Sequence, residues 1–392
     1  MPPATTTQRT HQQLKAWRER ILRRGGGSIA ERRQFNAALR SFQLRAGGGG
    51  GLLDAVKRGN TRRVRTLIKS GADTNQENDD GETPLWLASH SGKTAMVKML
   101  LAAGANTEAA STSYEYWKKD EPDGATPCWI AAQRGHAKVV KMLLAHGADP
   151  NAVAYYPSED PEKYFNQHLD KWSYEWEEER KTALRRYVDE QKKNRTPWGT
   201  PCFVAVQQGH KAVLVALMND DRTDPNKTTG TDGETPLLIA AEDGNSAIVA
   251  ALLANRLTDV DKEETKYGMT PCFVAAMNGR VEVVQLLLAR GADPNKATTD
   301  DGETPLMRAA KNGNASLVRL LLEHKADPNT AATDGSTPCS AAAKRGHEDV
   351  VQMLLAAGAE DCGWYRNLGK RIRGAFRQVA DDSESVGDDL FG

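Results

Sequence analysis

A pattern of apolar positions recurs along most of this chain and predicts pairs of short helices. In one copy it runs through Val139, Val140, Met142, Leu143 and Leu144. Apolar residues at this spacing cover one wide face of a helix, so the run predicts a well-buried helix. A shorter segment rich in small residues precedes it, and a glycine lies between the two segments. Each copy therefore predicts a helix, a tight turn and a second helix.

Threonine followed by proline opens the first helix of seven copies. These threonines are Thr83, Thr126, Thr200, Thr235, Thr270, Thr304 and Thr337. A threonine hydroxyl can accept from an unpaired amide at a helix start, and proline tolerates the first helical position. The threonines lie 43, 74, 35, 35, 34 and 33 residues apart, which indicates a unit of 33 to 35 residues with two longer gaps. A fixed period of this size predicts a solenoid.

The repeated sequence resembles the ankyrin repeat family. Residues 126–151 read TPCWIAAQRGHAKVVKMLLAHGADPN, and residues 270–295 read TPCFVAAMNGRVEVVQLLLARGADPN. The resemblance covers residues 51–360 and implies an all-α solenoid of about eight helix-turn-helix units with β-hairpin-like loops, flanked by amphipathic helices. The first unit, residues 52–75, lacks Thr-Pro, as an atypical capping repeat would.

The domain organisation follows from composition and spacing. We expect basic, partly disordered N-terminal helices at 1–46, a glycine linker at 47–51, repeats at 52–360, a basic capping helix at 361–379 and an acidic disordered tail at 380–392. Insertions at about 109–122 and 152–198 explain the longer gaps. The larger insertion is amphipathic, and we expect it to pack over the concave face, through Trp172 and Trp176, as a lid or as part of the binding site.

Charge is balanced overall but segregated along the chain. There are 52 Lys plus Arg against 52 Asp plus Glu, yet residues 1–46 carry a net charge of +8. No apolar run reaches the length of a membrane span, and the N-terminus has no apolar signal core. We therefore expect a monomeric cytoplasmic or nuclear protein. Mitochondrial targeting stays an alternative, because the N-terminus is rich in arginine and poor in acids.

The cysteines are expected to be structural. Cys128, Cys202, Cys272 and Cys339 directly follow Thr-Pro, where other copies carry leucine. Neighbouring repeats would place them about 10 Å apart, too far for disulfides or a shared metal. Cys362 lies outside the repeats and is the one candidate reactive thiol.

The histidines and glycines do not indicate an enzyme. His136, His210 and His347 follow the turn glycine, where the family pattern carries histidine, and are expected to bond across the loops of adjacent repeats. The sequence holds no zinc, nucleophile-elbow or phosphate-loop motif. We expect no catalytic residue, cofactor or metal.

The resemblance implies a non-enzymatic scaffold or adaptor that binds a protein on its concave face. The variable positions at the ends of the first helices and the loop tips are then the candidate partner-binding residues. They are His90, Ser91, Gln133, Arg134, Gln207, Gln208, Glu242, Asp243, Met277, Asn278, Lys311, Asn312, Lys344 and Arg345 on the helices, and Asp80, Asp123, Asp232, Asp301 and Asp334 at the tips.

Two features of this surface each allow two interpretations. The acidic tips favour a partner with a basic segment, or the aspartates merely serve the turns before glycine. The histidine of the family's Thr-Pro-Leu-His is replaced by a mostly apolar series, which either packs between neighbouring first helices or forms a groove for an apolar peptide. This series, the ladder, is Trp86, Trp129, Phe203, Leu238, Phe273, Met307 and Ser340.

Some repeat ends depart from the family pattern. Lys325 replaces the glycine that ends the second helix of the seventh unit. In the fourth and fifth units, Arg222-Thr223 and Leu257-Thr258 replace the usual Gly-Ala. We expect extended or strained helix ends there.

A different class of function also fits the sequence. The basic amphipathic segments at the termini predict a tether to an anionic membrane surface or to nucleic acid, with the repeats in a secondary role.

Overall fold

The computed structural model describes residues 50–78, 80–111, 124–155, 197–230, 232–360 and 362. These residues form sixteen helices arranged as consecutive helix-turn-helix pairs, which confirms the predicted all-α repeat solenoid. The predicted N-terminal helices, the C-terminal capping helix, the acidic tail and nearly all of the larger insertion lie outside the described residues. Asp123, Trp172 and Trp176 lie there too.

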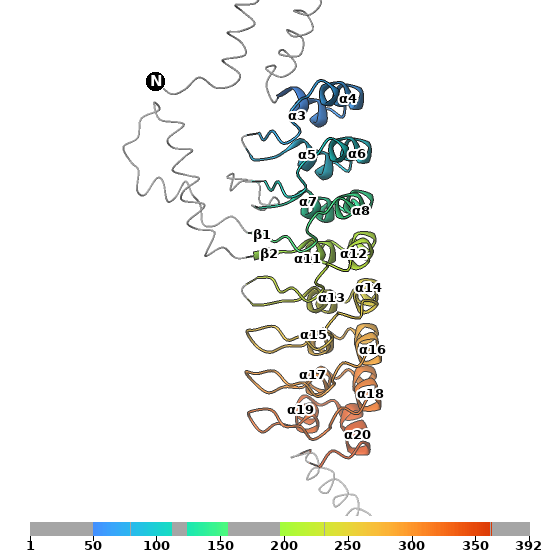
Figure 1. Ribbon diagram of the computed structural model, residues 1–392. Helices are drawn as coiled ribbons and strands as arrows, with labels where there is room; N and C mark the ends of the chain where they lie inside the picture. Colours follow the sequence, from blue (N-terminus) through green and yellow to red (C-terminus); the bar gives the residue numbers. More distant parts are fainter. Residues whose placement is uncertain are drawn as a thin grey trace, which may run out of the picture. The chain divides into compact units, whose positions relative to one another are not determined.

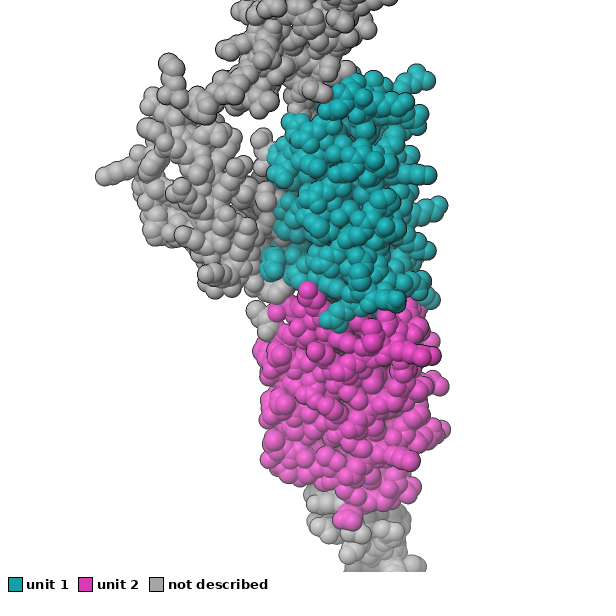
Figure 2. Space-filling model, in the orientation of Figure 1, with its two compact units in different colours: residues 1–224 teal, residues 225–392 magenta. Residues whose placement is uncertain are grey.

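The chain divides into two compact units, residues 1–224 and 225–392, and each is described by itself (Figure 2). The helices of unit 1 are α3 (Gly50–Lys57), α4 (Thr61–Lys69), α5 (Pro84–His90), α6 (Thr94–Ala102), α7 (Pro127–Gln133), α8 (Ala137–Ala145), α11 (Pro201–Gln207) and α12 (Lys211–Met218). Those of unit 2 are α13 (Pro236–Asp243), α14 (Ser246–Leu253), α15 (Pro271–Met277), α16 (Val281–Ala289), α17 (Pro305–Lys311), α18 (Ala315–Glu323), α19 (Pro338–Arg345) and α20 (Glu348–Ala356).

Within each unit the helices form two layers. First helices pack on first helices, as α5 does on α7 and α15 on α17, and second helices pack on second helices. The loops extend from the side of the first helices, opposite the second helices (Figure 1). Unit 1 also holds a two-stranded antiparallel sheet of β1 (Ala154–Tyr155) and β2 (Pro197–Gly199), which brings the two ends of the larger insertion together.

The Thr-Pro pairs start the first helices in the predicted way. In all seven cases the threonine hydroxyl accepts a hydrogen bond from the backbone N–H three residues later, at 3.1 to 3.3 Å. Proline occupies the first helical turn behind each of these threonines. One orphan amide of each helix is thereby satisfied, and the start of each helix is fixed.

The six apolar residues of the ladder are buried, as the packing interpretation predicts, whereas Ser340 is half-buried. Trp129 and Met307 are fully buried, and Phe203 is only 5% exposed. The two tryptophans of the ladder add hydrogen bonds that the sequence did not predict: Trp86 Nε1 donates to the carbonyl of Ala125, and Trp129 Nε1 to that of Gly199. An apolar ring with one polar atom can both pack and link adjacent repeats.

The helix ends that lack the usual glycine are completed in two different ways. Lys325 takes a positive φ of 67°, a left-handed conformation that costs an L-residue with a side chain about 1 kcal/mol or more. Thr223 and Thr258 instead donate their hydroxyls, at 2.7 Å, to carbonyls at the ends of α12 and α14. The predicted strain is thus present at Lys325, whereas the threonines satisfy groups that a helix end leaves open.

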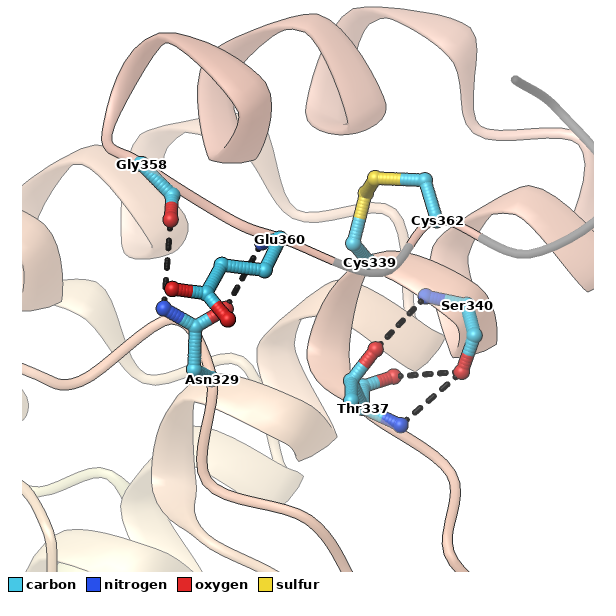
Figure 3. Close-up of a disulfide and its surroundings, with 7 residues drawn as sticks. All are labelled: Asn329, Thr337, Cys339, Ser340, Gly358, Glu360 and Cys362. Atoms are coloured by element: carbon cyan, nitrogen blue, oxygen red, sulfur yellow. Dashed lines mark hydrogen bonds between the residues drawn. A yellow bond between two sulfur atoms is a disulfide. The ribbon is translucent and has the colours of Figure 1, made fainter.

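The expectation that none of the cysteines forms a disulfide is wrong for Cys339 and Cys362. These two residues form a disulfide, with Cα atoms 4.9 Å apart (Figure 3). The distance of about 10 Å applies to cysteines at the same position of neighbouring repeats. Cys362 instead lies at the end of the last repeat and bonds to a cysteine of that same repeat. Cys128, Cys202 and Cys272 are buried free thiols, as predicted.

Candidate partner-binding surface

The surface of interest is the loop side of each unit, meaning its loops and the exposed ends of its first helices (Figure 1). Two kinds of link hold neighbouring loops together. In unit 2 the carbonyl of Asp232 accepts from both the backbone N–H and the hydroxyl of Thr265, at 2.7 and 2.8 Å. Asp301 accepts in the same way from Thr333. The backbone of Asp232 and Asp301 therefore links neighbouring loops. The carboxylates of Asp301 and Asp334 accept from Thr298 and Ser336 within their own turns, as the turn interpretation predicts.

Asparagines at the base of the loops provide the second link. Asn295 accepts from the N–H of Asp327 at 2.7 Å and donates to the carbonyl of Lys325 at 3.3 Å. Asn151, Asn226 and Asn329 make the same pair of bonds to the repeat that follows each of them. These asparagines were not among the predicted binding or linking residues. The signal that could have found them is the return of asparagine at the same position of the repeat.

The predicted histidine links are confirmed. His136 Nε2 lies 3.1 Å from the carbonyl of His90, and His210 Nε2 lies 3.0 Å from that of Gln133. His347 Nε2 lies 3.2 Å from the carbonyl of Lys311. Each bond joins the turn of one repeat to the end of the preceding first helix, so the helix ends on the loop side keep a fixed spacing.

The predicted helix-end residues fall into two groups in the structure. The exposed ones are Ser91, Arg134, Gln207, Gln208, Glu242, Asp243, Asn278, Asn312, Lys344 and Arg345, and the half-buried ones are His90, Gln133, Met277 and Lys311. Several also bond within the chain. Asn312 donates to the carbonyl of Met277, and Arg345 to that of Lys311. These two side chains help to join repeats, a role that the sequence analysis did not assign to them.

Lys311 belongs to a charged cluster inside the surface. The carboxylate of Glu303, which is 4% exposed, pairs with Arg308 Nη2 at 2.7 Å and also with Lys311 Nζ. The Arg308 guanidinium lies 5.5 Å from the centre of the Phe273 ring. The Asp301 carboxylate, 3.9 Å from Arg308 Nη2, adds a second negative charge, so two carboxylates offset the two cations. The positive charge of Lys311, a predicted partner-binding residue, is therefore largely used within the chain.

The α13 end of the unit 2 loop side is acidic. The pKa of Glu234 is raised, first because burial disfavours its charged form and then because the carboxylates of Glu242, Asp232 and Glu264 lie nearby. Lys266 Nζ is 3.8 Å from the Asp232 carboxylate, a long contact between two well-exposed groups. A negative potential therefore gathers around Glu234 and Glu242.

An apolar patch adjoins these acids through Ile239, which lies one helical turn before Glu242 on α13. Ile239, Met269 and Met277 are half-buried and pack on a cluster formed by Leu238, Phe273 and Val274. Here the sequence Tyr267-Gly268-Met269 replaces the Asp-Gly-Glu tip found at residues 232–234 and 301–303. Aligned tips show this exchange, but Tyr267 and Met269 were not among the predicted binding residues. Tyr267 is 38% exposed, with Lys266 Nζ 4.8 Å from its ring centre.

No group of three His, Cys, Asp or Glu side chains within the described ranges is arranged to hold a metal ion. None of the helices described is long and apolar enough to cross a membrane. The stacked helix pairs, the capped first helices and the linked loops define a helical repeat solenoid.

The family described as ankyrin repeats (3 copies) matches residues 52–154, 202–298 and 295–362. The chain belongs to the ankyrin repeat family. It is also similar to protein phosphatase 1 regulatory subunit 27 of Mus musculus, with 38% identity over 60 residues. That match covers 15% of this chain and 39% of the relative.

Proposed function

We propose that this protein is a non-enzymatic scaffold or adaptor that binds a protein partner on the loop side of its repeats. Ankyrin repeats imply protein–protein interaction. The observation that carries the finer proposal is the apolar patch of Ile239, Met269 and Met277 beside the carboxylates of Glu234 and Glu242. An apolar centre with a charged edge is the usual anatomy of a protein interface.

The chemistry of this patch favours one kind of partner segment. An apolar side chain of the partner would pack on the two methionines, which adapt to irregular shapes. A lysine or arginine next to it would lie against Glu234 and Glu242, whose crowded carboxylates gain from a cation. We therefore infer a partner segment in which an apolar residue neighbours a basic one.

The similarity to a phosphatase regulatory subunit supports an adaptor role for this chain. The matched relative is named as a regulatory subunit of a phosphatase. We extend only this role to the present protein. The chemistry of the partner rests on the patch in unit 2.

A random peptide display library panned against the full chain tests the proposal. We expect selected peptides in which a leucine, isoleucine or phenylalanine neighbours lysine or arginine. Glu242→Lys should weaken their binding at least about tenfold, because it places a like charge against the basic residue. Glu282→Lys is the matched control, since Glu282 is exposed on α16, in the layer away from the loops.

Fluorescence polarisation with one selected peptide then measures the two variants side by side. The affinity should also fall as salt is raised, because the charged edge is screened. Equal losses for Glu242→Lys and Glu282→Lys, or selected peptides without basic residues, would contradict the assignment to this patch.

A further inference from the structure

Four cysteines directly follow Thr-Pro, and one of them differs chemically from the others. Cys128, Cys202 and Cys272 are free thiols whose pKa is raised by burial to about 12. Cys339 is bonded to Cys362 (Figure 3). Because the thiolate is the reactive form, the three free thiols are poor partners for exchange at neutral pH. Among the described residues, only the last helix pair holds two cysteines close enough to join.

Cys362 occupies the slot in which other repeats carry their linking asparagine. Residues 291–295 read Gly-Ala-Asp-Pro-Asn, and residues 358–362 read Gly-Ala-Glu-Asp-Cys. Asn295 bonds forward to the next helix pair. No helix pair follows α20 among the residues described, and Cys362 bonds back to Cys339 in α19 of its own repeat. The disulfide stands in place of an inter-repeat link.

The segment 358–362 is also held from the preceding repeat. Asn329 donates to the carbonyl of Gly358 at 3.1 Å and accepts from the N–H of Glu360 at 2.8 Å (Figure 3). These bonds place the segment beside the last repeat whether or not the cysteines are joined. They bring Cys362 within reach of α19.

Cys339 is held just as firmly. Thr337 and Ser340 form a capping box, in which the Ser340 N–H donates to the Thr337 hydroxyl at 3.2 Å and the Thr337 N–H donates to the Ser340 hydroxyl at 2.9 Å. Cys339 lies in the helical turn that this box fixes. Cys339 is fully buried and Cys362 is 2% exposed, so the bond is sheltered from reductants until the segment opens.

We propose that Cys339 and Cys362 form a redox-sensitive clasp that closes the end of the last repeat. The oxidant is a small disulfide such as oxidised glutathione. The Cys362 thiolate attacks one of its sulfurs, and the other sulfur leaves as a thiolate. The Cys339 thiolate then attacks the Cys362 sulfur, forms the clasp and releases the second thiolate. The protein loses two electrons and two protons, and the oxidant becomes two thiols.

The clasp controls the local stability of the last helix pair. It closes a loop with a sequence separation of 23 residues, which contains nearly all of α19 and the whole of α20. Joining the loop ends removes freedom from the opened state. In a reducing compartment the pair is a dithiol and the segment is held mainly by Asn329, whereas oxidation fastens it.

Mapping the thiols of the full chain tests the bond itself. The protein is equilibrated with reduced or oxidised glutathione, denatured, alkylated and digested. In the oxidised sample we expect linked peptides containing Cys339 and Cys362, with Cys128, Cys202 and Cys272 alkylated. Alkylated Cys339 and Cys362 in that sample would refute the clasp.

Hydrogen exchange tests its effect. Reduction should speed exchange in α19 and α20 on the order of a hundredfold, the loop-closure effect expected for this length. Peptides of α15, which contains the free Cys272, and of α16 should not change. Cys362→Asn, which restores the family residue, should exchange equally in both buffers. If that variant fails to fold, the comparison of oxidised with reduced wild-type protein still tests the clasp. Equal exchange of α19 and α20 in the two wild-type samples would overturn the proposal.

Discussion

The indole Nε1 of Trp129 donates a 2.9 Å hydrogen bond to the carbonyl oxygen of Gly199, seventy residues along the chain. Gly199 ends β2, whose partner strand β1 lies at the other end of the insertion. The ring of Trp129 also meets the ring of Trp198 edge to face, with centres 5.9 Å apart. One ladder residue therefore fixes the point at which the chain returns to the repeats.

Trp129→Ala should mainly lower stability. We expect a loss of about 3 to 5 kcal/mol, because a fully buried side chain is replaced by a cavity. Trp129→Phe keeps most of the packing but leaves the Gly199 carbonyl without this donor, at a cost of about 1 to 3 kcal/mol. Urea unfolding of both variants measures the difference. Lost peptide binding with unchanged unfolding would show that Trp129 serves recognition instead.

Lys325→Gly should stabilise the protein. Glycine adopts the positive φ of 67° without the cost that a lysine side chain brings, and the net gain is about 1 kcal/mol after its greater freedom in the unfolded chain is counted. The link from Asn295 goes to the backbone carbonyl and should persist. His324→Gly is the control: its φ is −96°, so glycine there should destabilise. Thermal melting separates the two outcomes.

Asp261 occupies the slot of the linking asparagines, and its carboxylate accepts from the N–H of Asp293 at 3.1 Å. Its pKa is raised, first by burial and also by the Asp293 charge. Asp261→Asn should add a donor toward the Gly291 carbonyl and stabilise by about 1 kcal/mol.

The sign of the pH dependence at Asp261 follows from linkage. A raised carboxyl pKa in the folded state stabilises below the unfolded value of 3.8, and this contribution is lost as pH rises through the folded pKa. The gain from Asp261→Asn should therefore be larger near neutral pH than below 3.8, as denaturant titrations at the two pH values would show. Asn295→Asp makes the reverse change and should destabilise.

Near neutral pH, Glu234→Gln should raise the stability of the protein and weaken its binding of the selected peptide. The folded-state pKa of Glu234 is raised, by burial first and then by Glu242, Asp232 and Glu264. Its contribution to stability is present below the unfolded value of 4.5 and disappears as pH rises through the folded value, so the variant should melt higher near neutral pH only. Binding of the selected basic peptide should weaken at the same pH. A variant that melts higher and binds unchanged would remove Glu234 from the proposed surface.

The parts of the fold that repeat were predictable, because each depends on chemistry within a few residues. The Thr126 cap, the turn that precedes His136 and the apolar face of the second helix all follow from local spacing. The histidine link was predictable for a further reason: in a stack of identical units, the histidine of each unit meets the same partner position in the preceding unit.

The candidate surface was less predictable. The sequence marked Lys311 as outward-facing, but it could not show that Glu303 lies buried between Lys311 and Arg308. It likewise left open whether the tip aspartates form an acidic rim or serve the turns, whereas in the structure the Asp301 carboxylate accepts from Thr298 within its turn and the Asp301 carbonyl links to the next loop. A polar side chain can bind a partner protein only if it is not already paired within the chain. Its intramolecular partners lie in other helices and loops, so the local sequence does not reveal them.

By itself the sequence determined that this chain is an ankyrin-repeat solenoid, because a period near 34 residues with capped helices and glycine turns allows each unit to bury its apolar face against its neighbours. Tertiary structure alone decided the exceptions to the repeat: the bond of Cys339 to Cys362, the reach of Trp129 to Gly199 and the patch around Met269. Each of these depends on contacts between groups that are brought together only when the chain folds.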